Sequence, residues 1–557
     1  MALLSSPRRF QVQRSLPVIA MRMLWWGVLV CWLNVSSAVA QIQLDRFFPP
    51  AVGTGQSLVI QAEGKFPKWP VEIMVDRDDV SIRAEKDSGK LKVEVAAEAP
   101  PGIVWVRAFD ADSASALVPL LIEPTAPKEE VEPNQTLDEA TELQMPCSVA
   151  GRLSKSGEVD TFRVSVKAGR TLVVSVIANE ILGSPMDAVL QLVNEAGHVL
   201  RQADDQRGLD PQLVYPVAED ADLYVRLFAF PETPNSTIGF AGAATFVYEL
   251  RATTDAFVDH VLPLSGESDK ADRFEVQGWN LADAAGVRQQ KVNRLGGAAI
   301  HVPESLGWQY LDTNAAGQNH FIESEELTVV EKLPCSFSGR ISAAGEVDRV
   351  QISVNKGAKY RVVAHARRSG MILDSVLRVI DLQDGKELAR NDDKKRGEYD
   401  ASVDFTAGHT GQIEVQVSDL VDGFGMRHAY TLVATEVEPA VEVTLAEEHF
   451  VLKAGESLEL PVSIARLDGY ALQLRIGVSG LPEGVTCKPV VSEAKGDSAK
   501  AVKLKLEAKN DLTHQGVIKV EVFELDKEGS VAGEPFFAGY DLAKTIRIED
   551  VWLTIAP

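Results

Sequence analysis

Oxygen-bearing side chains alternate along one short segment of the chain and return in a later turn. Glu130, Glu132 and Asn134 occupy every second position, and Asp160 lies in a turn before an apolar stretch. Since alternate residues of an extended segment point to the same side, these side chains can converge. Ca²⁺ takes about six to eight oxygen ligands, including carboxylates. The pattern therefore predicts a candidate calcium site at Glu130, Glu132, Asn134 and Asp160; the alternative is a solvated acidic linker in which Asp160 caps its own turn.

The residue patterns typical of common enzyme classes are missing from the sequence. It has no Gly-x-Ser-x-Gly elbow, no His-Glu-x-x-His zinc helix and no Cys-x-x-Cys pair. Gly53-Thr54-Gly55 lacks the third glycine of a dinucleotide fingerprint. The nine histidines are scattered, without a metal-like partner two to four residues away. We therefore expect no catalytic residues and no organic cofactor.

Two further groups of residues have alternative interpretations. Asp204-Asp205 and Asn391-Asp392-Asp393 are either ligand runs or, more simply, solvated turns. Four aromatic residues around a proline-containing loop form either a ligand-binding rim or packing beneath that loop: Phe228, Phe230, Phe240 and Phe246.

The elements that must position these residues occur twice. Cys147-Ser148-Val149-Ala150-Gly151-Arg152-Leu153 returns 188 residues later as Cys335-Ser336-Phe337-Ser338-Gly339-Arg340-Ile341, and Gly157-Glu158-Val159-Asp160 returns as Gly345-Glu346-Val347-Asp348. Solenoid repeats reach at most about 50 residues, so this repeat indicates a duplicated domain.

Alternating apolar residues favour strands nearly everywhere. Phe162, Val164 and Val166 share one face, a turn at Gly169 follows, and Leu172 and Val174 alternate again, which predicts a half-buried hairpin. Helical periodicity is scarce; only 137–140 favours a helical turn. Short strands with turns at this spacing predict an all-β fold of tandem β-sandwiches, both jelly-roll-like and immunoglobulin-like.

Linkers and turn signals divide the 557 residues into six predicted segments. These are a signal peptide (1–40), an immunoglobulin- or TIG-like β-sandwich (41–124), the first repeat (125–255), a small β insert (256–322), the second repeat (323–437) and a C-terminal immunoglobulin-like β-sandwich (438–557).

An ordered series of residues in the first repeat resembles the bacterial pre-peptidase C-terminal (PPC) domain. The series is Glu132-Pro133-Asn134, Gly151-Arg152-Leu153, Gly157 to Phe162, Asp187 to Leu190, and Asp204-Asp205. The second repeat keeps most of it but has Glu323-Ser324-Glu325-Glu326 at its start. The two copies cover about 240 residues, and Gly480 to Val485 is similar to bacterial immunoglobulin-like modules of the NEW3 kind.

The resemblance implies a jelly-roll-like sandwich that serves as an accessory module beside secreted proteases or in other exported proteins. Calcium-binding, collagen-binding relatives carry acidic and amide ligands in an extended linker and aspartates in the later turn. Glu130, Glu132, Asn134 and Asp160 match that pattern, whereas Gln135 and Gly157 stand where those relatives have aspartates. The second repeat lacks the linker ligands, so no site is expected there.

The chain's N-terminus and charge bear on its location. Basic residues precede the apolar run 23–33 and the small-residue pattern Ser37-Ala38-Val39-Ala40, which predicts export with cleavage after Ala40; an uncleaved anchor is the alternative. No later segment is apolar enough to span a bilayer. The formal charge of −24 disfavours nucleic acid and anionic membranes as partners. The three cysteines after the signal, Cys147, Cys335 and Cys487, are expected to be buried thiols.

Together these observations predict an exported, non-catalytic protein of the periplasm, cell surface or exterior. Its expected role is adhesion to, or scaffolding of, an unknown protein or polysaccharide ligand. Two alternatives remain: an accessory component or divergent remnant of a secreted protease, and a structural spacer of the envelope.

Overall fold

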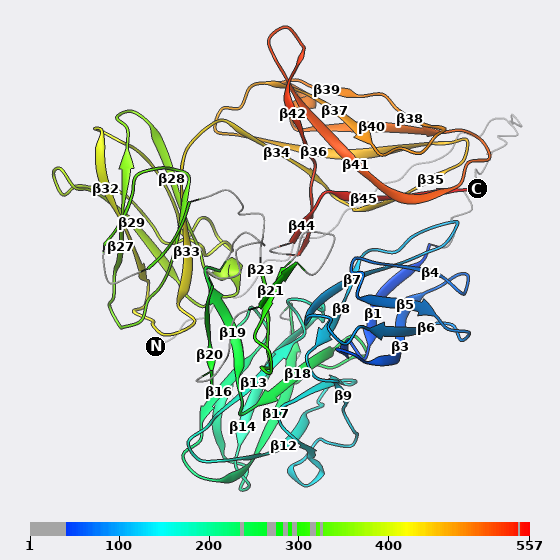
Figure 1. Cartoon of the computed structure of the whole chain (residues 1–557), viewed down its shortest axis with the longest axis vertical. Coiled ribbons are helices and arrows are strands. Elements are labelled where there is room, and N and C mark those ends of the chain that lie inside the picture. The colour runs from blue at the N-terminus through cyan, green and yellow to red at the C-terminus, as the bar shows by residue number, and fades with distance from the viewer. Residues whose placement is uncertain are drawn as a thin grey trace, which may run out of the picture. The chain divides into compact units, whose positions relative to one another are not determined.

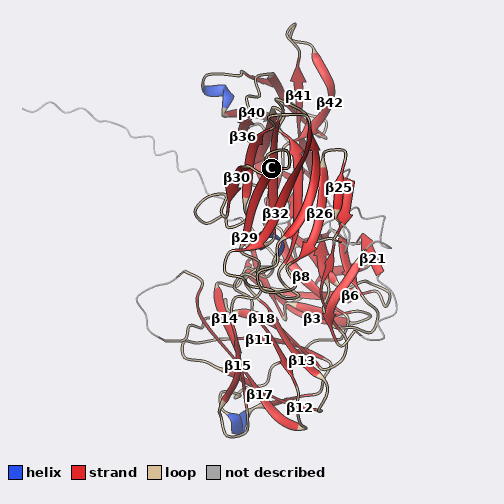
Figure 2. Cartoon of the chain, turned by 90° about the vertical axis from the view of Figure 1, so that its left-hand side faces the viewer, coloured by secondary structure: helices blue, strands red, loops and turns tan. Residues whose placement is uncertain are grey.

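The computed structural model describes residues 41–233, 239–264, 274–281, 288–291, 298–311, 319–323, 327–543 and 546–557. The predicted signal peptide (1–40) lies outside them. Residues 41–557 form one compact unit. Strands dominate it, as Figure 2 shows, and the helices η1 (Leu137–Glu139), η3 (Arg367–Ser369) and η4 (Asp497–Ala499) of the described residues are single turns, so the predicted all-β class is confirmed. None of the helices in the described ranges has the length and apolar character needed to cross a membrane.

The N-terminal sandwich consists of two four-stranded sheets, in the orders β1-β3-β6-β5 and β2-β8-β7-β4. Its inward-facing side chains alternate along each strand, for example Leu91, Val93 and Val95, and fill the space between the sheets. The strands are β1 (Gln43–Phe48), β2 (Ala51–Gly53), β3 (Ser57–Lys65), β4 (Glu72–Val75), β5 (Val80–Ala84), β6 (Lys90–Val95), β7 (Gly102–Phe109) and β8 (Val118–Glu123).

The first repeat is a sandwich of two five-stranded sheets, in the orders β10-β12-β17-β14-β15 and β16-β13-β18-β11-β9 (Figure 1). The predicted hairpin around Gly169 does not pair β12 with β13; the turn instead carries the chain from one sheet to the other. The elements are β9 (Lys128–Glu129), η1 (Leu137–Glu139), β10 (Thr141–Leu143), β11 (Cys147–Arg152), β12 (Asp160–Val166), β13 (Thr171–Ile177), β14 (Met186–Val193), β15 (Val199–Ala203), β16 (Gln212–Pro216), β17 (Ala221–Pro231) and β18 (Val247–Thr253).

The second repeat reproduces this topology strand for strand, with the sheet orders β25-β27-β32-β29-β30 and β31-β28-β33-β26-β24. Even the irregularity between β14 and β15 returns between β29 and β30. The elements are β24 (Asn319–Ile322), β25 (Thr328–Val330), β26 (Cys335–Arg340), β27 (Asp348–Val354), β28 (Lys359–His365), η3 (Arg367–Ser369), β29 (Ser375–Asp381), β30 (Glu387–Asn391), β31 (Ser402–Thr406), β32 (Gly411–Asp419) and β33 (Ala429–Glu436).

The segment between the repeats forms two small sheets. The strands are β19 (Phe257–Leu262), β20 (Glu275–Trp279), β21 (Arg288–Lys291), β22 (Ala298–His301) and β23 (Gln309–Leu311). The predicted insert boundary at residue 322 separates β24 from its partner β26, with which β24 pairs in parallel. Placing β24 in the insert is therefore wrong, because its backbone hydrogen bonds belong to the second repeat.

The C-terminal sandwich pairs a four-stranded sheet, β34-β36-β40-β38, with a larger sheet that contains β35-β45-β41-β37-β39 and β42. The strands β43 and β44 form a separate hairpin. The elements are β34 (Ala440–Leu445), β35 (His449–Lys453), β36 (Ser457–Leu467), β37 (Gln473–Ser479), β38 (Val485–Cys487), β39 (Val490–Ser492), η4 (Asp497–Ala499), β40 (Ala501–Ala508), β41 (His514–Leu525), β42 (Val531–Phe537), β43 (Tyr540–Ala543), β44 (Ile546–Ile548) and β45 (Asp550–Ala556).

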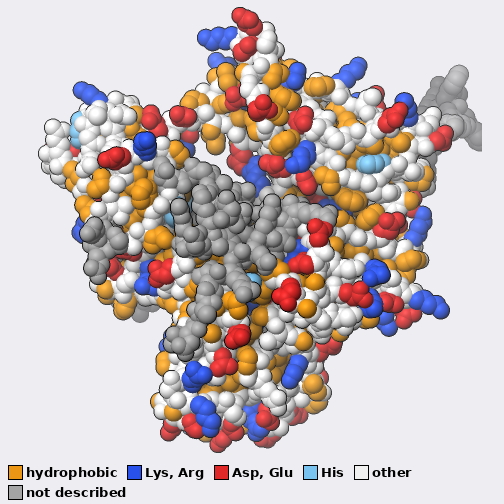
Figure 3. All heavy atoms as spheres, viewed as in Figure 1, with side chains coloured by type: hydrophobic (Ala, Val, Ile, Leu, Met, Phe, Trp, Pro, Cys, Tyr) orange, Lys and Arg blue, Asp and Glu red, His pale blue; other side chains and the backbone are white. Residues whose placement is uncertain are grey.

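The surface over these apolar interiors is mixed in character (Figure 3). Acidic, basic and apolar side chains are interspersed over the face in view in Figure 3. Cys147, Cys335 and Cys487 are free thiols; the first two are buried, as expected, and Cys487 is half-buried.

Candidate functional site

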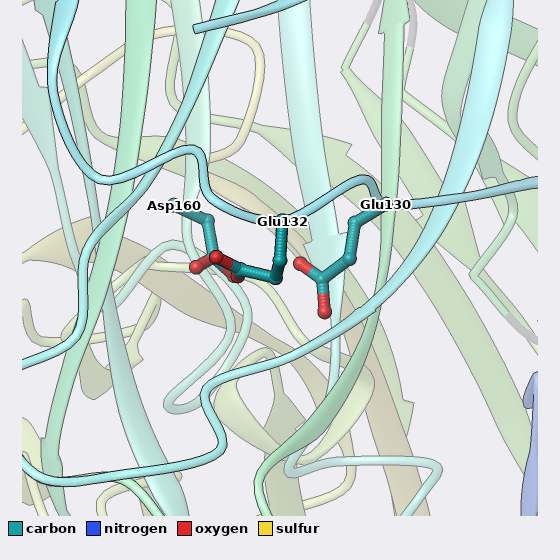
Figure 4. A group of neighbouring side chains, drawn as sticks. All are labelled: Glu130, Glu132 and Asp160. Carbon is teal, nitrogen blue, oxygen red and sulfur yellow. The ribbon is translucent and has the colours of Figure 1, made fainter. Parts of the chain in front are cut away.

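Three carboxylates of the predicted site meet where the linker enters the first repeat. Glu130 follows β9, Glu132 lies two residues further on, and Asp160 begins β12. One carboxylate oxygen from each lies within 4.8 Å of the others. Figure 4 shows the carboxylates of Glu132 and Asp160 side by side, with Glu130 next to them. The alternation and the turn thus bring together the side chains that the sequence suggested.

Backbone pairing fixes the linker against the sheet. The short strand β9 pairs in parallel with β11, and the Glu130 amide continues this ladder by donating to the Ala150 carbonyl at 3.0 Å. One carboxylate oxygen of Glu130 (Oε1) accepts the Arg152 amide at 2.6 Å. Further along, the Asn134 carbonyl accepts the Thr161 amide at 2.9 Å, which holds Asn134 next to Asp160.

Tyr248 completes the cluster and was not anticipated from the sequence. Its hydroxyl oxygen lies 2.7 Å from Glu130 Oε2 and 2.6 Å from Asp160 Oδ2. The ring crosses from β18 over Gly151, its register partner on β11, where an added Cβ would lie 2.2 Å from the ring. The signal that could have revealed it is the tyrosine near the end of each repeat, Tyr248 and Tyr430, together with the repeated Gly-Arg pair.

The hydroxyl of Tyr248 has one proton, yet it touches two carboxyl groups. Contacts this short between oxygens require a hydrogen between them, so one carboxyl must be protonated when no cation is bound. Burial raises the pKa of Asp160 to about 10, and the charge of Glu130 adds to the rise. Burial also raises the pKa of Glu130, and burial and the charge of Glu158 raise the pKa of Glu132. The cluster therefore retains a proton at neutral pH unless positive charge is supplied.

Two buried polar groups at the cluster have no hydrogen-bond partner among the described residues. The Asn134 side chain is fully buried, and neither its Oδ1 nor its Nδ2 is paired. Asp160, also fully buried, leaves Oδ1 unpaired. A buried amide or carboxylate without a partner costs about 1–3 kcal/mol or more. Ligation of a cation by the carboxyl cluster would satisfy Asp160 Oδ1.

The donor set suits a hard divalent cation. Glu130, Glu132 and Asp160 contribute carboxylates, and Glu132 is exposed, which leaves a route for an ion and its waters. Asn134, the fourth predicted ligand, lies next to Asp160 through its backbone and has a buried, unpaired amide. Gln135 and Gly157 contribute no carboxylate. If each of the four residues binds through one oxygen, together they supply fewer oxygens than Ca²⁺ prefers. Carboxylates that bind through both oxygens, or water, must then complete the coordination shell.

The second repeat contains a related cluster, although its linker was expected to lack ligands. Glu323, Glu346 and Asp348 bring carboxylate oxygens within 4.8 Å of one another. Glu323 accepts the Arg340 amide at 2.9 Å, as Glu130 accepts that of Arg152, and the Tyr430 hydroxyl lies 2.8 Å from Asp348. The expectation that the second repeat lacks linker ligands is therefore wrong for Glu323, because the parallel pairing of β24 with β26 places its carboxylate beside Glu346 and Asp348.

The other predicted candidates are packing and turn residues. Phe228 and Phe240 stack at 4.2 Å in a small apolar cluster with Val159 and Val189, and Phe246 belongs to the core of the first repeat. Phe230 is partly exposed at the edge of that cluster. Asp204 accepts the Asp205 amide, as expected for a turn.

A buried network of charged side chains joins the segment between the repeats to both repeats. The sequence patterns did not predict it. Asp259 on β19 accepts Arg427 of the second repeat at 2.6 Å and Arg207 of the first repeat at 3.1 Å. Burial acts to raise the pKa of Asp259, but the two guanidinium groups hold that pKa well below its usual value. His260 Nδ1 lies 2.6 Å from the same carboxylate. The network therefore holds these charged side chains in fixed positions, largely inside the protein, and presents little of them to solvent.

Comparison with known proteins finds likenesses to solved structures at low sequence identity. No protein-family model matches the sequence, and no curated protein does. Fibronectin(III)-like modules of Clostridium thermocellum CbhA align at 10% identity over 43% of this chain and 92% of theirs, with a TM-score of 0.13. The M60 catalytic domain with CBM51 domains of Clostridium perfringens ZmpB aligns at 9% identity over 68% of this chain and 48% of that one (TM-score 0.15). A DUF4785 family protein from Legionella pneumophila aligns at 13% identity over 42% and 69%, respectively (TM-score 0.13).

Proposed function

We propose that this chain is an exported, non-catalytic scaffold of the bacterial envelope or exterior that binds a protein or polysaccharide. In this proposal its two repeats are sandwiches of the PPC type, and the first repeat uses Ca²⁺ to fix its linker. The observation that carries the proposal is the cluster of Glu130, Glu132 and Asp160 beside the unpaired, fully buried amide of Asn134.

The distribution of buried charge supports a scaffold. Arg251 of the first repeat forms a buried ion pair with Glu123 of the N-terminal sandwich, and Arg107 of that sandwich pairs with Glu448 of the C-terminal one. Asp259 joins Arg207 and Arg427 in the same manner. Buried ion pairs add little net stability but fix geometry, since breaking one leaves an uncompensated charge. Such contacts suit a protein that presents binding surfaces at set positions.

The calcium site is tested by thermal unfolding of the mature chain in EDTA and in Ca²⁺. At a Ca²⁺ concentration about 100 times the Kd, binding contributes about 2.7 kcal/mol. We expect this to raise the Tm of the transition of the first repeat by several degrees. The double variant Glu132→Gln/Asp160→Asn should lose the rise, because it removes two carboxylate charges while retaining side-chain shape.

The second repeat supplies the matched control. Glu346→Gln/Asp348→Asn makes the same chemical change in the homologous cluster, where no buried amide of the Asn134 kind is present among the described residues. It should leave the calcium-dependent rise intact. An unmutated chain that shows neither a calcium-dependent rise nor calorimetric binding would refute the site.

The partner is tested by capture from envelope fractions with the mature chain as bait. A specific protein or glycan supports binding, whereas reproducible failure supports the spacer alternative. Gelatin or casein zymography tests the protease alternative. Activity that is lost when a nucleophile is substituted would overturn the non-catalytic proposal.

A further inference from the structure

Arg152 connects the carboxyl cluster to the N-terminal sandwich. Its main-chain amide donates to Glu130 Oε1 at 2.6 Å, and its guanidinium Nη2 donates to Glu63 Oε1 at 2.6 Å. The guanidinium also lies 4.5 Å from the centre of the Phe48 ring. One residue therefore contacts the candidate cation site through its backbone and the preceding sandwich through its side chain.

The ion pair between Arg152 and Glu63 is partly buried. The Arg152 side chain is 16% exposed and that of Glu63 is 25% exposed. Glu63 on β3 is the register partner of Arg46 on β1, and the Arg46 guanidinium approaches it at 3.4 Å. Partial burial reduces solvent screening, so this ion pair should be stronger than a fully exposed pair.

A similar construction is present in the second repeat. The Arg340 amide donates to Glu323 at 2.9 Å, while its Nη1 donates to Gln277 Oε1 on β20 at 2.8 Å. In both copies the arginine of the Gly-Arg pair thus holds the linker glutamate with its backbone and reaches the element that precedes the repeat with its guanidinium. A repeated geometry across differing sequences indicates a shared constraint on the arginine.

We propose that Arg152 couples ion binding at the carboxyl cluster to docking of the N-terminal sandwich on the first repeat, so that each strengthens the other. The inference rests on the cation site proposed above. Ligation of Glu130 would immobilise the linker and the end of β11, which sets the direction of the Arg152 side chain toward Glu63. By linkage, a sandwich held by Glu63 must favour ion binding by the same factor.

The test is calorimetric titration of the mature chain with Ca²⁺, in unmutated protein and in Glu63→Gln. Glu63 lies outside the set of candidate ligands, so a local site would be unaffected. We expect the Kd for Ca²⁺ to rise about fivefold or more, in the range usual for coupled sites. Glu94→Gln, which removes an exposed partner of Arg83 and Lys92 on the same sandwich, is the matched control and should leave the Kd unchanged.

Hydrogen exchange of residues 128–134 supplies a second readout that does not depend on fitted affinity. Ca²⁺ should slow exchange there in the unmutated chain and less so in Glu63→Gln. Arg152→Gln keeps the backbone donor and should match Glu63→Gln, with no further loss in the double variant. Calcium binding of equal Kd in all these proteins would overturn the coupling and leave the site standing, whereas no binding by the unmutated chain would overturn both.

Discussion

Asp160 and Tyr248 make the first repeat sensitive to protons when no cation is bound. In the unfolded chain Asp160 ionises near pH 4, whereas burial and the charge of Glu130 raise its folded pKa to about 10. Between these values the folded protein binds more protons than the unfolded protein, so the free energy of unfolding falls as pH rises. The fall due to this group is at most about 1.4 kcal/mol per pH unit.

Denaturant unfolding in EDTA at pH 5, 7 and 9 measures this dependence. Asp160→Asn should flatten the profile of the first repeat, because the amide has no proton to lose. Asp348→Asn is the comparison variant: its carboxyl has a pKa raised by burial, then by Glu323, to about 7, so its contribution should end near neutral pH. A slope between pH 7 and 9 that survives Asp160→Asn would contradict the assignment.

At the scale of the element, the pairing of β11 with β18 depends on a glycine, Gly151, which has no side chain. Tyr248 crosses over Gly151, where an added Cβ would lie 2.2 Å from the ring. Gly151→Ala should therefore displace Tyr248 from Glu130 and Asp160 and destabilise the first repeat by about 1–3 kcal/mol, as overpacking does. Urea unfolding measures the loss. Gly408→Ala, whose Cβ would meet no atom within 4 Å, should be close to neutral. Equal effects of the two changes would show that the close approach is not needed.

The sequence predicted the secondary-structure elements better than it predicted the contacts between side chains. Alternation predicted the strands, and the repeat predicted a duplicated unit, because burial of alternate side chains is a local constraint. Alternation likewise joined Glu130, Glu132 and Asn134 in one hypothesis, to which the later turn added Asp160. Tyr248 escaped it because its place depends on the register of β18 against β11, which a linear pattern does not encode.

The positions of the other residues that the sequence did not predict depend on how particular strands pair. Consecutive residues of a regular strand point to opposite faces, so Asp259 and His260 gave no reason to expect contact. The register between β19 and β20 shifts between Val258 and His260, and this bulge lets both side chains meet. Glu323 was not predicted as a ligand because the second repeat lacks the Glu-Pro-Asn start. The parallel pairing of β24 with β26, which the linear pattern does not encode, places its carboxylate beside Glu346 and Asp348.

At the scale of the whole molecule, buried ion pairs connect segments that are distant in sequence. Glu448 at the start of the C-terminal sandwich accepts Arg107 of the N-terminal sandwich and, at 3.1 Å, the Leu117 amide. Both side chains of the ion pair are almost fully buried, at 3% and 2% exposure. Specific pairing of this kind favours one assembly of sandwiches over many, which is the property that a scaffold needs.

Substitution of one partner in this ion pair should separate the unfolding of the two sandwiches. Glu448→Gln leaves the Arg107 guanidinium buried without a counter-charge, and removal of one partner from such a pair costs about 3–5 kcal/mol. Scanning calorimetry should then show the C-terminal sandwich melting earlier and apart from the N-terminal one. The exposed pair of Lys503 and Glu459 gives the control, since Glu459→Gln should change stability by about 0–1 kcal/mol. If Arg107→Met/Glu448→Met restores joint melting, the ion pair supplies geometry and not net stability; if Glu448→Gln melts as the unmutated chain does, the contact does not hold the sandwiches together.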